Sequence, residues 1–65
     1  MQIVLSEELQ TIIQLVASGK KNEEIGQELN YSVKTVERRI KTLFNLYKVQ
    51  NRVQLTAEYM AERLS

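Results

Sequence analysis

The sequence contains no cysteine, no histidine and no aspartate, so all of its acidic residues are glutamates. Without cysteine the chain forms no disulfide, and without these three residue types it lacks nearly every ligand that transition metals prefer. The missing histidine also removes the most common general base and every standard catalytic triad. The sequence therefore predicts that the protein is not an enzyme and that it holds no metal and no cofactor.

Proline is also absent, and glycine occurs only at positions 19 and 26, so no glycine-rich loop is present to hold a phosphate group. No apolar run approaches the roughly 20 residues that a membrane span requires, and the first residues do not resemble a signal peptide. We therefore expect no contact with a membrane. A chain of 65 residues with 43% hydrophobic content is enough for one small domain, residues 1–65.

The spacing of apolar residues predicts an all-α fold with four helices, at about residues 6–18, 23–29, 33–47 and 52–63. Ser6, Asn22, Ser32 and Asn51 precede these helices and are suitable N-caps. Gly19 suits the left-handed position that follows a helix. The short second helix, the polar break and the longer third helix have the layout of a helix-turn-helix.

The first three helices each carry an apolar stripe, and these stripes are expected to form the core. The predicted core residues are Leu9, Ile12, Ile13, Val16, Ile25, Leu29, Val36, Ile40, Leu43 and Phe44. Gly26 lies beside the apolar stripe of the second helix, which indicates that another helix approaches closely there. The fourth helix has two apolar sides. Its larger stripe, expected to face the core, consists of Val53, Ala57, Met60, Ala61 and Leu64, whereas Leu55, Thr56 and Tyr59 form a second side that needs cover.

The net charge of the chain is only +1, but the positive charge is concentrated in one segment. Residues 33–52 hold six lysines and arginines against one glutamate, a net charge of +5. Residues 1–32 hold two lysines against five glutamates, and residues 53–65 hold one arginine against two glutamates, so both flanking segments carry net negative charge. A basic segment that coincides with the third helix is the charge distribution expected of a nucleic-acid-binding protein.

An ordered set of residues runs along about residues 5 to 60: Leu5-Ser6, Ala17-Ser18-Gly19, Asn22-x-Glu24-Ile25, Leu29, Ser32, Thr35-Val36, Ile40, Leu46, Val49 and Arg52. This set resembles the LuxR-type (GerE-type) helix-turn-helix DNA-binding domain, the C-terminal output domain of many bacterial transcription regulators, including response regulators of two-component systems. The sequence departs from the family pattern in several places. Glu8-Leu9 replaces the usual Arg-Glu pair, Gly26 an alanine, Glu37 a lysine, Arg39 a histidine and Leu55-Thr56 an Ala-Val pair.

The resemblance implies sequence-specific binding of double-stranded DNA, with the third helix in the major groove, by the effector part of a longer regulator in the bacterial cytoplasm. It also implies a homodimer through the fourth helix, and no small molecule bound by this domain. We assign the dimer contact to Leu55, Thr56 and Tyr59 and expect it to be weak in the isolated domain. The alternative is a small helical protein–protein interaction module that does not bind DNA. Only DNA binding predicts an affinity that falls steeply with salt.

The predicted DNA-binding residues all belong to the third helix and its N-cap: Ser32, Lys34, Thr35, Glu37, Arg38, Arg39 and Lys41. Arg38 and Lys41 are one turn apart on the outer face, where an arginine can bind guanine O6 and N7 and a lysine can reach guanine or a phosphate. Glu37 repels phosphate, but its carboxylate can accept a hydrogen bond from cytosine N4.

The start of the third helix suits a phosphate oxygen, because backbone amides and hydroxyls are exposed there. Ser32 is expected to cap the helix as well. For Thr35 a phosphate contact and a hydrogen bond within its own turn are equally plausible. Arg39 borders the apolar stripe, so its stem is expected to pack while its head reaches either a phosphate or a glutamate. For Arg52 the alternatives are a structural salt bridge with an acidic residue, which we favour, and a contact with DNA.

Overall fold

The computed structural model describes residues 3–64, which form four helices and no strand: α1 (Glu7–Ala17), α2 (Asn22–Leu29), α3 (Val33–Tyr47) and α4 (Arg52–Leu64). The all-α prediction is confirmed, and each predicted helix boundary differs from the structure by at most one residue. None of these helices is long and apolar enough to cross a membrane.

Polar side chains cap three of the helices as predicted. In each case a side-chain oxygen accepts a hydrogen bond from the backbone N–H three residues later, at 3.3 Å for Ser6, 3.2 Å for Ser32 and 2.9 Å for Asn51. The second helix differs, because Asn22 is its first helical residue and Lys21 is its N-cap. The N–H of Lys21 donates instead to the carboxylate of Glu24, at 2.8 Å. The prediction that Asn22 caps α2 is therefore wrong.

The break between α2 and α3 is a tight turn that depends on Asn30 and Gly26. Asn30 ends α2 in the left-handed conformation, with φ 60°, which asparagine tolerates better than most residues. The N–H of Tyr31 then donates to the carbonyl of Gly26 at 2.8 Å. A Cβ atom at position 26 would lie 2.6 Å from the carbonyl oxygen of Tyr31. Gly26 therefore allows a close approach, as predicted, but the approaching segment is the turn rather than a neighbouring helix.

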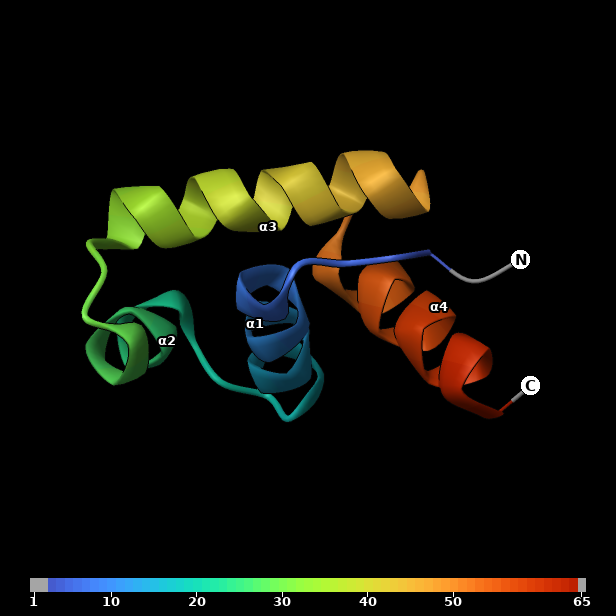
Figure 1. Ribbon diagram of the computed structural model, residues 1–65, viewed down its shortest axis with the longest axis horizontal. Coiled ribbons are helices and arrows are strands. Elements are labelled where there is room, and N and C mark those ends of the chain that lie inside the picture. The colour runs from blue at the N-terminus through green and yellow to red at the C-terminus, as the bar shows by residue number, and fades with distance from the viewer. Residues whose placement is uncertain (1–2, 65) are drawn as a thin grey trace.

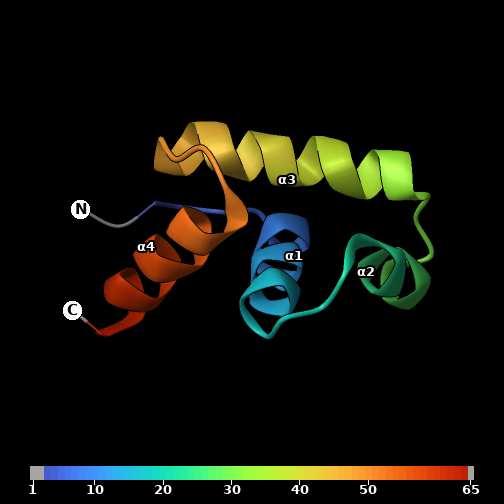
Figure 2. The same cartoon turned by 180° about the vertical axis from the view of Figure 1, so that it is seen from behind.

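The helix α3 lies across the other three helices along one side of the molecule (Figure 1). It packs on α2 near its start, on α1 in the middle and on α4 towards its end, and the view from behind shows the same order (Figure 2). The helix α1 contacts all three of the others. This arrangement leaves one long side of α3 facing away from the rest of the protein.

The core lies between α1 and α3 and extends onto α2 and α4. Its buried residues are Ile12, Ile13, Val16, Ile25, Val36, Ile40, Leu43, Tyr47, Leu55 and Tyr59. Seven of the predicted core residues are buried. The other three, Leu9, Leu29 and Phe44, are only half-buried and pack against the edge of the core. Three buried residues lie outside the predicted list: Tyr47, which continues the apolar stripe of α3, and Leu55 and Tyr59 of α4.

The predicted orientation of α4 is wrong by about half a turn. Leu55 is fully buried and Tyr59 is 8% exposed, whereas Val53 is 80% and Leu64 85% exposed. The assignment of Leu55, Thr56 and Tyr59 to an exposed dimer surface is therefore incorrect, since only Thr56 keeps part of its surface in solvent. The helix packs on α1 and α3 through the side that carries Leu55 and Tyr59, so the larger stripe is left in solvent.

A glutamate on α4 ties the start of the chain to α3. Glu62 accepts a hydrogen bond from the N–H of Ile3 at 2.9 Å and another from the hydroxyl of Tyr47 at 3.3 Å. Burial, and the nearby carboxylate of Glu62, raise the pKa of Tyr47 to about 12. The hydroxyl of Tyr47 therefore stays protonated and remains a donor across the physiological pH range.

Candidate nucleic-acid interface

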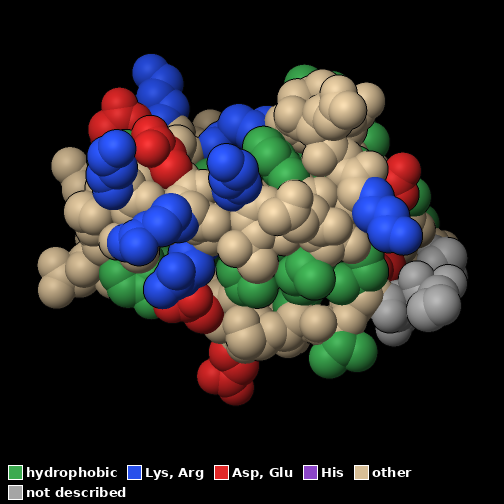
Figure 3. Space-filling model, turned by 90° about the horizontal axis from the view of Figure 1, so that it is seen from above, with side chains coloured by type: hydrophobic (Ala, Val, Ile, Leu, Met, Phe, Trp, Pro, Cys, Tyr) green, Lys and Arg blue, Asp and Glu red, His purple; other side chains and the backbone are tan. Residues whose placement is uncertain are grey.

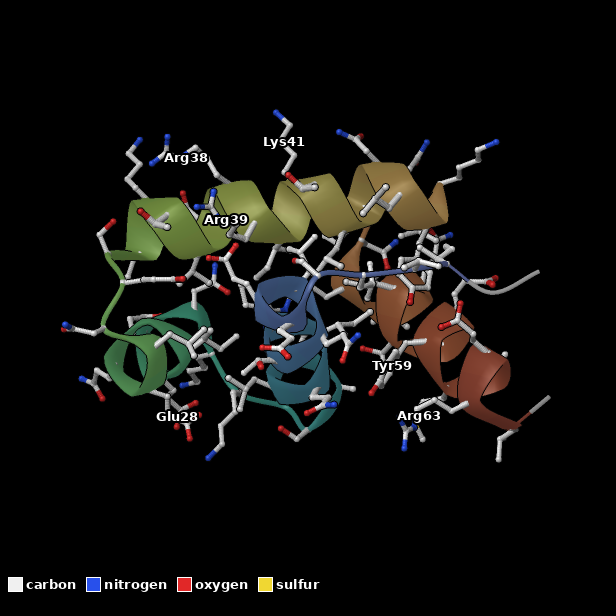
Figure 4. All side chains as sticks on the ribbon, viewed as in Figure 1. Glu28, Arg38, Arg39, Lys41, Tyr59 and Arg63 are labelled. Atoms are coloured by element: carbon white, nitrogen blue, oxygen red, sulfur yellow. The ribbon has the colours of Figure 1, made fainter. Side chains whose placement is uncertain are left out.

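The outer face of α3 is formed by the side chains that do not pack against the other helices. Val36, Ile40, Leu43 and Tyr47 recur at three- and four-residue steps and are buried, so the opposite side of the helix faces solvent. That side carries Lys34, Glu37, Arg38 and Lys41, all of which are exposed. Figure 4 shows Arg38 and Lys41 projecting from α3 away from the other helices.

Positive charge gathers over the first half of α3. Seen from above, lysine and arginine side chains crowd this part of the surface, and a few acidic side chains lie among and beside them (Figure 3). An open hollow of about 580 Å³ lies among four side chains, those of Lys34, Glu37, Arg38 and Lys41. Three basic side chains and one acidic side chain line the hollow, and it is wide open to solvent. Such a surface suits an extended anionic partner better than an enclosed small molecule.

The two hydroxyl groups at the start of α3 bind each other. The Oγ of Ser32 accepts from the N–H of Thr35 and lies 3.0 Å from the Oγ1 of Thr35. Ser32 therefore caps the helix, and Thr35 forms the hydrogen bond within its own turn that the sequence left as one of two alternatives. Lys34 stands between them with its side chain in solvent.

Arg39 is held beside the outer face by Glu8 of α1. The Nε of Arg39 donates to one carboxylate oxygen of Glu8 at 2.8 Å, and the hydroxyl of Tyr31 donates to the other. The hydrogen bond from Tyr31 and then the interaction with Arg39 lower the pKa of Glu8, while the same bond and burial raise the pKa of Tyr31. Of the two partners considered for Arg39, the structure shows the glutamate. The three residues join α1, the turn and α3.

The outward basic face of α3, the tight turn before it and the supporting helix α2 together form a helix-turn-helix. A family model described as bacterial regulatory proteins, luxR family (GerE), matches residues 3–59. The chain belongs to the LuxR family. Searches of curated proteins and of solved structures gave no significant match. The four helices are thus a helix-turn-helix DNA-binding domain of the kind that transcription regulators of this family contain.

In this LuxR-family domain Arg52 forms a contact that the sequence did not predict correctly. Its guanidinium donates to the side-chain oxygen of Asn22 at 2.6 Å and to the carbonyl of Lys20 at 2.8 Å. The expected acidic partner is therefore wrong, although the structural role is right. The contact fixes the start of α4 to the start of α2. No local pattern signals it, because the paired residues are 30 and 32 positions apart.

The LuxR-family domain brings most of the predicted DNA-binding residues together on one surface. Lys34, Glu37, Arg38 and Lys41 share the outer face, with Ser32 and Thr35 at its beginning. Arg39 lies to one side, and Figure 4 shows it lower on α3 than Arg38. The predicted dimer residues on α4 do not join this surface.

Proposed function

We propose that this LuxR-family domain binds double-stranded DNA in a sequence-specific manner, with α3 in the major groove. The observation that carries the proposal is the outer face of α3, where Arg38 and Lys41 stand one turn apart and exposed. Within residues 3–64 neither side chain forms a hydrogen bond or an ion pair, so both are available to a ligand. A 15-residue helix is about 22 Å long, and the major groove, about 12 Å wide, admits a helix.

The residues divide into base contacts and phosphate contacts. Arg38 presents a planar fork to guanine O6 and N7, and Lys41 binds guanine or a phosphate. Lys34 and the exposed start of the helix, including Ser32 and Thr35, bind phosphate oxygens and so fix the register on the duplex. We assign Arg39 to the positioning of α3, because its Nε is already bound by Glu8.

The proposal is tested by titrating a fluorescent duplex, selected from a random pool, with the parent domain and with Arg38→Ala. Loss of a base contact should weaken binding to the selected duplex by roughly 5- to 150-fold, equivalent to about 1–3 kcal/mol, and relax preference at one base pair. Arg63→Ala is the matched control, since it removes the same charge from α4. Figure 4 shows Arg63 on the other side of the molecule from Arg38. The control should bind almost as well as the parent.

Equal weakening by Arg38→Ala and Arg63→Ala would mean that only overall charge matters and that the reading face is misplaced. The salt dependence separates the remaining alternative, a protein-interaction module. Binding to phosphates predicts a steep loss of affinity as salt rises, and a module that does not bind DNA predicts no saturable binding to any duplex.

We further propose that the domain forms a homodimer through α4, by a different face from the one the sequence indicated. Val53, Met60 and Leu64 fall on one side of the helix and are 80%, 48% and 85% exposed, and the small residue Ala57 lies between them. A single helix face is smaller than the roughly 1,200 Å² that stable interfaces bury, so the contact is weak until two copies meet on DNA. A two-fold pair would place two copies of α3 on neighbouring half-sites.

Membership in a family of bacterial regulatory proteins supports the wider role. We propose that the domain is the output part of a longer transcription regulator, such as a response regulator of a two-component system, in the bacterial cytoplasm. In such a protein a separate domain receives the signal, and the four helices described above deliver it to DNA.

A further inference from the structure

Glu37 is the single acidic residue of α3 and stands in the middle of its basic face. Lys34 and Lys41 occupy the positions three before and four after it, from which a lysine commonly pairs with a glutamate on a helix. Within residues 3–64, however, Glu37 forms neither an ion pair nor a hydrogen bond through its side chain, and it is exposed. Its carboxylate is therefore available to a ligand on the same face as the cations.

The surroundings of Glu37 show where such a ligand would lie. The residue lines the open hollow that it shares with Lys34, Arg38 and Lys41. It also lines a second hollow of about 330 Å³, together with Ile40, Lys41, Phe44 and the pair Asn22 and Arg52. Glu37 and Lys41 thus form the ridge between the two hollows. A duplex that contacts Arg38 and Lys41 would bring its base edges to the carboxylate as well.

The chemistry of a carboxylate restricts which base it can recognise. An ionised carboxylate only accepts hydrogen bonds, and the donors in the major groove are the N4 amino group of cytosine and the N6 amino group of adenine. Adenine presents the acceptor N7 beside its amino group, and this acceptor would repel a carboxylate. Guanine presents acceptors alone, which suit the neighbouring Arg38 and Lys41. Cytosine is therefore the base that fits Glu37.

We propose that Glu37 determines specificity by accepting a hydrogen bond from N4 of a cytosine. This inference rests on the proposed function and adds a feature of the preferred duplex. Glu37 and Lys41 are four residues apart, about 6 Å along the helix axis, and successive bases of one strand are about 3.4 Å apart. The preferred half-site therefore contains a cytosine read by Glu37 within about two base pairs of guanines read by Arg38 and Lys41.

Repulsion between the carboxylate and the DNA phosphates is the competing role for Glu37. Repulsion weakens binding to every duplex by the same factor, because phosphates carry no sequence information. A hydrogen bond to cytosine strengthens binding only where cytosine is present. The two roles are thus separated by whether a substitution changes the base preference at one position or changes the affinity for all duplexes together.

The test compares the parent with Glu37→Gln in selections from a random duplex pool. Titrations then follow with four duplexes that carry each of the four bases in turn at the affected position. Glutamine pairs with adenine N6 and N7. We expect the preferred base at one position to change from cytosine to adenine. The affinity of Glu37→Gln for the adenine duplex should exceed its affinity for the cytosine duplex by roughly 5- to 150-fold. The remaining positions of the half-site should keep their preferences.

Glu28→Gln is the matched control, because it removes the same charge from an exposed glutamate of α2. Figure 4 shows Glu28 on the side of the molecule opposite to Arg38 and Lys41. The control should select the same duplex as the parent. If Glu37→Gln also selects the same duplex and only binds all four duplexes more tightly, Glu37 contributes repulsion and the inference is overturned. A parent that prefers no duplex over random DNA would instead overturn the proposed function itself.

Discussion

Truncation of Leu55 to alanine tests the corrected orientation of α4 against the one that the sequence suggested. Leu55 is fully buried, so Leu55→Ala removes buried carbon atoms and leaves a cavity, at a cost of about 2–5 kcal/mol. A domain of 65 residues has a total stability of roughly 3–10 kcal/mol. For a domain of this size, each kcal/mol lowers the melting temperature by about 4–8 °C. The substitution should therefore lower the melting temperature by on the order of 10 °C or more.

Val53→Ala is the matched control on the same helix. Val53 is 80% exposed, and an exposed substitution of this kind changes stability by about 0.5 kcal/mol or less. Thermal unfolding, followed by far-UV circular dichroism, gives the melting temperatures of both variants for comparison with that of the parent. If Leu55→Ala melts with the parent, Leu55 does not face the core, and if Val53→Ala melts as early as Leu55→Ala, Val53 is not on an exposed side of α4.

Three further results are expected. Gly26→Ala should destabilise the domain by about 1–3 kcal/mol in denaturant unfolding, because the new Cβ would meet the carbonyl oxygen of Tyr31; an increase in stability would mean that the turn relaxes freely. The pKa of Glu8 is lowered in the folded state, so its contribution to folding stability is fully present above the unfolded pKa, near 4.5, and is lost as pH falls through the folded pKa. The melting temperature of Glu8→Gln should therefore fall less in acid than that of the parent. Met60→Glu should reduce cooperative binding to a duplex with two half-sites and leave binding to one half-site unchanged, and equal losses on both would place the dimer contact elsewhere.

Local signals made most of the fold predictable. Helix starts depend on a side chain and a backbone N–H three residues away, so Ser6, Ser32 and Asn51 mark them in the sequence. The orientation of α3 was predictable for a similar reason. Its apolar residues form one stripe only, and the basic residues lie opposite, so burial of the stripe directs Arg38 and Lys41 outward.

The contacts that were not predicted join residues far apart in the chain. The helix α4 has two apolar sides, and only its packing on α1 and α3 decides that Leu55 and Tyr59 face inward. Glu8 and Arg39 are separated by 31 residues, so nothing in the sequence near Arg39 identifies the carboxylate that holds it. The same holds for Arg52, which finds neutral oxygens rather than the expected acid.

Methylation protection with dimethyl sulfate tests the central claim, the reading of bases by α3 in the major groove, most directly. The reagent methylates guanine at N7, which faces the major groove, and adenine at N3, which faces the minor groove. We predict that the parent domain protects specific guanine N7 atoms in its selected duplex, and that Arg38→Ala loses protection at one of them while Arg63→Ala does not. Unprotected guanines in a fully bound duplex, or protection confined to adenine N3, would contradict the account.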